Sequence, residues 1–186
     1  MQISDELHRS RPWRVHELAP DFPLHDAWRF EIEGSADDFD EFLRVQEQAF
    51  TARSAGRWSA AGLLFRLREA MSLLDADPGL PRVRERIGGD RESSLGPFEL
   101  VYREPDECLH EICNRTVHAL LHLGWVETDD GWSPEMAVYV KPQGWLGRGY
   151  MALINPFRHL IVYPTLMRRV REAWTTRTAE PGETRH

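Results

Sequence analysis

Residues 114–142 read NRTVHALLHLGWVETDDGWSPEMAVYVKP, and this stretch decides the fold class. In the first half, the odd-numbered residues from Val117 to Trp125 form an unbroken apolar file with a period of two. In the second half, Met136, Val138 and Val140 repeat with the same period. Such alternation is typical of strands with one buried face. The polar segment between the halves predicts the turn of a β-hairpin.

The register of this hairpin can be tested against the pattern. A four-residue loop between the arms pairs Leu123 with Val138 and puts His122 opposite Tyr139 on the other face. A two-residue turn centred on the same point keeps these pairs. It places Pro134, which has no amide hydrogen, at a hydrogen-bonded position. The sequence therefore favours the four-residue loop.

His118 and His122 raise the question of a metal site. On a helix, two histidines four residues apart share one face and can chelate an ion. The usual helical zinc motif has a glutamate directly after the first histidine, and Ala119 stands there. On a strand, residues four apart are separated by about 13 Å, too far for one ion. We predict a strand and no metal site.

Two interpretations of His118, His122 and Tyr139 remain open. In the first, these residues lie on the more polar face and pack under the N-terminal arm or meet water. In the second, a histidine is the general base of a pocket and Tyr139 donates a hydrogen bond to a developing oxyanion. They are therefore the candidate catalytic residues.

The remaining chain predicts an α+β protein. The alternation at 27–33 predicts a first strand, and Ser35 followed by acidic residues predicts the start of a helix at 36–50. A second helix is predicted at 59–75 from its apolar spacing. Two strands, 98–103 and 108–113, precede the hairpin.

The C-terminal segment 150–174 has a broad apolar face. Pro156 and Pro164 predict a kink, because proline cannot donate to the preceding helical turn. We expect residues 1–10 to be a flexible N-terminus, residues 11–174 a single domain and residues 175–186 a disordered tail.

Composition excludes several classes of function. The chain has 186 residues, 41% of them hydrophobic and 28% charged, with a formal net charge of −7. This charge argues against binding of nucleic acid. We predict no membrane span, because no apolar run reaches about 20 residues. The start lacks a secretory signal, so we expect a cytoplasmic protein. Cys108 and Cys113 form no Cys-x-x-Cys unit, and we predict neither a cofactor nor a disulfide between them.

Four strings carry a resemblance to a bacterial family, the domain of unknown function 2867. They are RPWRVHELAPDF at 11–22, NRTVH with HLGWV at 114–126, MAVYVKP at 136–142, and YMA with PFRHLIVYP at 150–164. The resemblance implies a START-like, or helix-grip, fold, in which a curved antiparallel sheet wraps a long C-terminal helix. Proteins of that broad fold bind lipids, polyketides or hormones, and some are cyclases or hydrolases. The family provides no established reaction.

Our leading hypothesis is a domain that binds a small hydrophobic molecule in a cavity between the sheet and the C-terminal helix. The predicted walls of this cavity are Trp125, Met136, Val138 and Phe157. Two alternatives are a cyclase- or hydrolase-type enzyme that uses a pocket histidine, and a protein-interaction domain. The sequence determines neither the ligand nor the oligomeric state.

Overall fold

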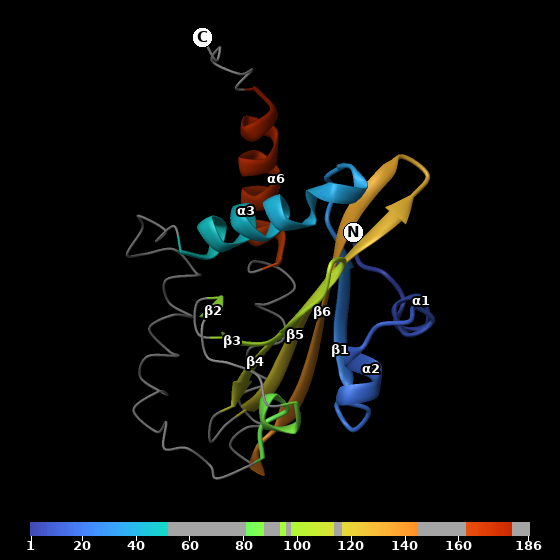
Figure 1. Cartoon of the computed structure of the whole chain (residues 1–186), viewed down its shortest axis with the longest axis vertical. Coiled ribbons are helices and arrows are strands. Elements are labelled where there is room, and N and C mark those ends of the chain that lie inside the picture. Colours follow the sequence, from blue (N-terminus) through green and yellow to red (C-terminus); the bar gives the residue numbers. More distant parts are fainter. Residues whose placement is uncertain (52–80, 88–93, 96–97, 114–116, 145–162, 180–186) are drawn as a thin grey trace.

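The computed structural model describes residues 1–51, 81–87, 94–95, 98–113, 117–144 and 163–179. Six strands form one antiparallel sheet: β1 (Leu24–Arg29), β2 (Ser94–Leu95), β3 (Phe98–Arg103), β4 (Glu107–Cys113), β5 (Val117–Thr128) and β6 (Gly131–Pro142). Their spatial order is β1-β6-β5-β4-β3-β2 (Figure 1). β1, the first strand of the chain, is therefore an edge strand and pairs with β6, the last. The predicted α+β class with an antiparallel sheet is confirmed.

The central hairpin of β5 and β6 differs from the prediction by two residues. Thr128 pairs with Gly131, which leaves a two-residue turn, and Leu123 faces Met136 instead of Val138. The predicted four-residue loop is therefore wrong. Gly131 has a φ of 129°, a left-handed value that glycine adopts at little cost. A shift of two keeps every side chain on its predicted face, so the alternation fits both registers.

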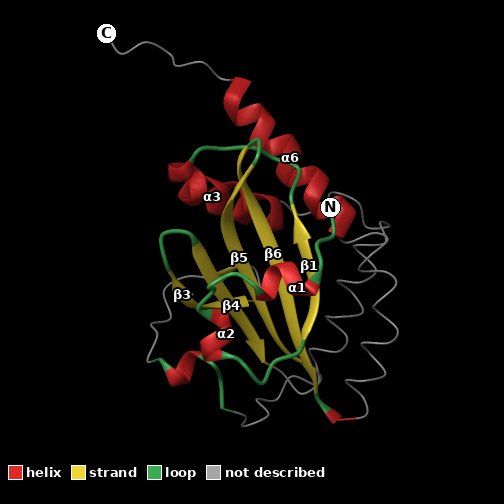
Figure 2. Ribbon diagram, turned by 90° about the vertical axis from the view of Figure 1, so that its right-hand side faces the viewer, coloured by secondary structure: helices red, strands yellow, loops and turns green. Residues whose placement is uncertain are grey.

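Each face of the sheet is covered by different elements (Figure 2). The odd-numbered file of β5 faces α3 (Phe39–Thr51) and α6 (Tyr163–Ala179), and we name this side the helix face. The even-numbered file faces the N-terminal segment with α1 (Asp5–Arg9) and α2 (Val15–Leu18), together with the 3-10 turn η2 (Arg84–Arg86). We name this side the arm face.

The helix face holds the larger apolar core. The turn η1 (Ala36–Asp38) and α3 form where the sequence predicted a helix, and Asp38 accepts a hydrogen bond from the amide of Ser35 at 2.8 Å. Phe42 of α3 lies with its ring 5.6 Å from that of Trp125. Trp174 of α6 contacts the same indole at 6.0 Å. The two helices therefore pack on β5 through one aromatic cluster.

The C-terminal helix extends beyond its predicted end. α6 continues to Ala179, five residues into the expected disordered tail at 175–186. Trp174 anchors this part, because its indole donates to the carbonyl of Glu33 at 2.9 Å. Pro164 is the second residue of α6, where the missing amide hydrogen removes no helical bond. The predicted kink at Pro156 and the predicted helix at 59–75 lie outside the described residues.

The N-terminal residues contact the rest of the domain. Ile3 donates to the carbonyl of Ala27 at 3.0 Å, and α1 places His8 at 0% exposure. The flexibility expected for residues 1–10 stays a prediction. Ser4 caps α1 by accepting from the amide of Leu7 at 3.2 Å. The assignment of residues 11–174 to one domain stays a prediction. No helix in the described part of the chain is long and apolar enough to span a membrane.

Candidate functional site

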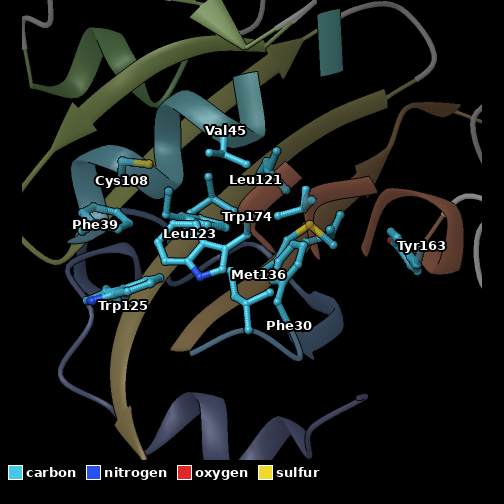
Figure 3. Close-up of a cluster of buried hydrophobic side chains, with 14 of the residues drawn as sticks. Phe30, Phe39, Val45, Cys108, Leu121, Leu123, Trp125, Met136, Tyr163 and Trp174 are labelled. Atoms are coloured by element: carbon cyan, nitrogen blue, oxygen red, sulfur yellow. The ribbon is translucent and has the colours of Figure 1, made fainter. Parts of the chain in front are cut away.

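The predicted ligand-binding residues of the sheet lie on the helix face. Trp125, Met136 and Val138 belong to its apolar cluster and are 1%, 1% and 9% exposed. Figure 3 shows Trp125 and Met136 among the side chains of this cluster. Side chains of α3 and α6 belong to the same cluster. Their role as ligand walls stays a prediction. Phe157 lies outside the described residues.

A pocket of about 420 Å³ lies on the helix face, between α3 and strands β3, β4 and β5. Its walls combine an apolar set with buried polar groups and a charged rim. The apolar set is Leu43, Leu100, Cys108 and Leu123; the polar groups are Gln46 and His110; the rim is Asp40, Arg44, Glu47 and Arg103. β5, β4 and β3 follow one another in the sheet, so these walls come from neighbouring strands.

Gln46 is the unusual side chain of this pocket. It is 0% exposed, and neither its Oε1 nor its Nε2 has a hydrogen-bond partner within the part of the chain that the structure describes. A buried polar group without a partner costs about 1–3 kcal/mol. More than nine-tenths of buried polar groups in proteins are satisfied. Gln46 therefore offers its amide NH2 group as a donor and its amide oxygen as an acceptor at the pocket wall.

His110 and Cys108 are neutral in this environment. Burial, and then the nearby charge of Arg103, lower the pKa of His110 to about 4. Burial raises the pKa of the Cys108 thiol to about 12. The Sγ atom of Cys108 lies 3.9 Å from Nδ1 of His110. A thiol with a raised pKa carries little thiolate near neutrality, which weakens it as a nucleophile.

The candidate catalytic residues lie on the opposite, arm face. His118, His122 and Tyr139 are 4%, 0% and 2% exposed. The corrected register puts His122 opposite Ala137, so the predicted pairing of His122 with Tyr139 is wrong. These side chains share a face, as the alternation predicted, but that face is turned away from α6.

His8 of α1 joins His122 and Tyr139. Its Nε2 lies 2.8 Å from the hydroxyl of Tyr139, and its ring centroid lies 5.4 Å from that of His122. Burial, and then the neighbouring His122 and His16, lower the pKa of His8 to about 3. The imidazole is therefore neutral near neutral pH. The N-terminal segment docks on these two residues through a hydrogen bond and ring contacts.

Glu107 organises the same region from β4. Its carboxylate accepts from the Tyr102 hydroxyl at 2.8 Å and from the backbone amide of Arg14 at 2.9 Å, and lies 2.8 Å from Nε2 of His122. Burial acts to raise the pKa of Glu107, but these hydrogen bonds outweigh it and the pKa is lowered. The ring of Trp13 covers His122 at 5.1 Å. Glu107 thus holds the arm in place and has no open access to a substrate.

His118 has a different environment. Its Nε2 lies 2.5 Å from Glu111, whose carboxylate also accepts from the amides of Val83 at 2.7 Å and Arg84 at 3.1 Å. Burial acts to raise the pKa of Glu111, but these donors outweigh it and the pKa is lowered, so the group is a carboxylate. His118 also lines a pocket of about 440 Å³ at the end of the arm face. It is the candidate catalytic residue that lines this pocket.

Most of the chain matches one protein family. Residues 18–165 match the family described as protein of unknown function (DUF2867). The chain belongs to this family. The match includes all four strings that carry the resemblance except residues 11–17 of the first. No curated protein matches the chain.

One solved structure is similar to this DUF2867 protein, with a low score. It is the di-domain ARO/CYC StfQ from the steffimycin biosynthetic pathway, at 9% identity and a TM-score of 0.41. The alignment covers 89% of this chain and 56% of the other, so the chain spans about half the length of that protein. A TM-score of this size supports no argument about fold or function, and the START-like assignment stays a prediction.

Sequence reasoning missed several groups of this DUF2867 protein. Gln46, His110 and Glu111 were not singled out, and Lys141 received no functional weight. A glutamine on the apolar side of a predicted helix was the available signal for Gln46. No signal links Glu111 to His118 before the strands are paired. Among the described residues, no group of three or more His, Cys, Asp or Glu side chains is arranged to hold a metal ion.

Proposed function

We propose that this protein binds a small, largely apolar molecule in the helix-face pocket. Gln46 is the observation that carries the proposal: its fully buried amide has no hydrogen-bond partner among the described residues, and a hydrogen-bonding ligand would offset its desolvation. A volume of about 420 Å³ is within the usual range for small-molecule sites. Leu43, Leu100 and Leu123 provide the apolar walls expected of such sites.

The polar groups define what the ligand carries. The amide of Gln46 can donate to a carbonyl and accept from a hydroxyl or amide hydrogen. His110, neutral because of its lowered pKa, adds a hydrogen bond without a buried charge. A ligand with one or two uncharged polar groups on an apolar body fits this combination. We propose Trp125, Met136, Val138 and Phe157 as the more distant wall of the site. The first three lie on the same face of the sheet as the pocket.

Gln46→Leu tests the proposal, because leucine keeps a similar volume and removes the orphaned amide. We expect the free protein to gain about 1–3 kcal/mol in free energy of unfolding, since a desolvated polar group is lost. We also expect the variant to lose the thermal shift that apolar ligands with a carbonyl or hydroxyl group give to the wild type. Gln48→Leu, on the exposed side of α3, is the matched control and should retain the shift.

Leu100→Trp gives an independent test, since its larger ring fills the pocket from β3. It should abolish ligand binding while Gln46 is intact. The proposal is contradicted if no ligand of a broad panel shifts the wild type and Gln46→Leu leaves the stability of the free protein unchanged.

The two alternative functions meet different constraints. A cyclase- or hydrolase-type enzyme based on His118, His122 or Tyr139 needs its substrate on the arm face, away from the helix-face pocket. A protein-interaction domain would need an apolar sheet face for its partner. In the described part of the chain, the centre of the sheet is covered on both sides by the chain itself.

A further inference from the structure

The second pocket places a base and a cation side by side. His118 on β5 and Lys141 on β6 are cross-strand partners, and both line the pocket of about 440 Å³ on the arm face. Directly opposed residues of an antiparallel pair have Cβ atoms about 5 Å apart, so both side chains can reach one small molecule. Lys141 is the only lysine of the sequence. The corrected register creates this pair, because the predicted register would place Gln143 opposite His118.

Glu111 orients the imidazole of His118. The carboxylate lies 2.5 Å from Nε2, which favours the tautomer with hydrogen on Nε2 and leaves Nδ1 as the acceptor. Two backbone donors, the amides of Val83 and Arg84, fix the carboxylate. When Nδ1 takes a proton, the negative charge of Glu111 compensates the imidazolium. This is the arrangement of an oriented base described for other acid–base sites.

Lys141 is held at the pocket by an ion pair with Asp21. Its ammonium also lies 4.1 Å from the centre of the Phe22 ring. The Asp21 side chain is 49% exposed and Arg86 pairs with it at 3.4 Å. Hydrogen bonding to Lys141, with a smaller contribution from Arg86, lowers the pKa of Asp21 to about 2. Because Asp21 reaches water, its carboxylate can turn outward and leave the ammonium to another anion.

We propose that this arm-face pocket binds and ionises a weakly acidic hydroxyl compound, a phenol or the enol of a carbonyl compound. The hydroxyl proton moves to Nδ1 of His118, and the resulting oxyanion pairs with the ammonium of Lys141. The transfer needs no further reactant, because the proton and the negative charge both stay in the site. Phe22 and Pro23 provide an apolar wall for the ring or carbon body.

This site is independent of the helix-face proposal, since the two pockets share no lining residue and lie on opposite faces. Loss of binding in Gln46→Leu therefore does not affect it. The groups that face His118 and Lys141 are Glu111 on β4, Asp21 and Phe22 before β1, and Arg86 in η2.

4-Nitrophenol is a suitable probe, because its ionised form absorbs at a longer wavelength than the neutral form. We expect the full chain to produce the phenolate band at a pH below the pKa of the free phenol. His118→Gln keeps a donor for Glu111 but cannot take the proton, so it should bind the probe without the band. Lys141→Met should weaken binding by about tenfold or more, the effect of losing a charged hydrogen-bond donor.

Asp21→Asn is the decisive variant, because we expect it to increase the affinity for the phenolate. Removing the competing carboxylate frees Lys141, and we expect binding of the phenolate to tighten by about tenfold. A folding defect cannot produce this result. His25→Gln is the matched control outside the pocket and should behave as the wild type.

Two results would overturn the proposal. One is the absence of a phenolate band when the wild type is saturated with the probe. The other is a band that persists in the double variant of His118→Gln and Lys141→Met. If Asp21→Asn binds the phenolate no more tightly than the wild type, Lys141 does not pair with the oxyanion and that assignment is wrong.

Discussion

The helix face buries mainly aromatic rings and aliphatic groups, whereas the arm face of the same sheet buries three carboxylates, Glu107, Glu111 and Glu135. Each of these carboxylates is paired with a basic side chain. The helix face is thus stabilised by removal of apolar area from water. This contribution is non-directional and does not require exact positions of the contacting groups. The arm face is stabilised by satisfied polar groups, which need partners at defined positions. The N-terminal segment provides several of these partners: Arg11 donates to Glu135, and the amide of Arg14 donates to Glu107.

We expect Trp125→Ala, on the helix face, to cause the largest loss in free energy of unfolding. Trp125 is 1% exposed and contacts rings from both α3 and α6, so its removal leaves a large apolar void. We expect a loss of about 4 kcal/mol in free energy of unfolding, measured in urea. Trp132→Ala, at a half-buried position of the same cluster, should cost less. Equal losses would mean that the helix face is not closely packed around Trp125.

Glu135→Gln tests the arm face in the same way. Glu135 is 0% exposed and its Oε1 accepts from Arg11 at 3.0 Å and from Arg29 at 2.7 Å. Removing one partner leaves two arginines with their charge uncompensated, and we expect a loss of about 3 kcal/mol. Glu127→Gln, on the exposed end of β5, is the control and should be neutral. A neutral result for Glu135→Gln would show that the arm face does not depend on charge pairing.

The titratable groups of the arm face should make the free energy of unfolding depend on pH. The pKa of His8 is about 3 in the folded protein against 6.5 in the unfolded chain. Below about pH 6.5 the unfolded chain takes up a proton that the folded protein refuses, so stability falls as the pH falls. The lowered pKa values of Glu107 and Glu111 act in the same direction, because their stabilisation is lost as they are protonated.

His8→Gln should reduce this pH dependence. At about pH 5 the His8 contribution corresponds to about 2 kcal/mol, which the variant should recover relative to its own value at neutral pH. His110 retains its own lowered pKa on the helix face, so the dependence should not vanish. Urea titrations of the wild type and the variant at two pH values measure the difference. Parallel losses in both would remove His8 as the cause.

Alanine substitutions at two glycines form a matched pair, and we expect them to have the smallest effects on stability. A Cβ at Gly34 would lie 2.8 Å from the ring of Trp125, and one at Gly124 would lie 2.7 Å from the ring of Trp13. We expect Gly34→Ala to cost about 2 kcal/mol and Gly124→Ala about 1 kcal/mol, within the range for overpacking. The difference arises because the N-terminal arm can move outward, whereas Trp125 is held between two helices. A larger cost at Gly124 would mean that the arm is the more rigid layer.

Strands β3 to β6, the start of the first long helix and the two-face division of the hairpin were predictable. β1 was predicted at 27–33 but spans Leu24–Arg29, and β2 was not predicted. Alternation and capping act over a few residues and need no knowledge of the fold. The contacts of the N-terminus were not predictable from its polar composition. His8 and Trp13 pack against His122, Tyr139 and Gly124 of β5 and β6, and these contacts link distant parts of the chain.

The sequence by itself determined that β5 and β6 form a hairpin and which side chains share a face, because a period of two is a local property of the chain. The tertiary structure decided the register, since a shift of two residues leaves that period unchanged. It therefore also decided that Lys141, and not Gln143, stands beside His118. The orphaned amide of Gln46 and the pairing of Glu111 arise only when distant segments meet, because desolvation and hydrogen bonding depend on neighbours that the linear pattern does not contain.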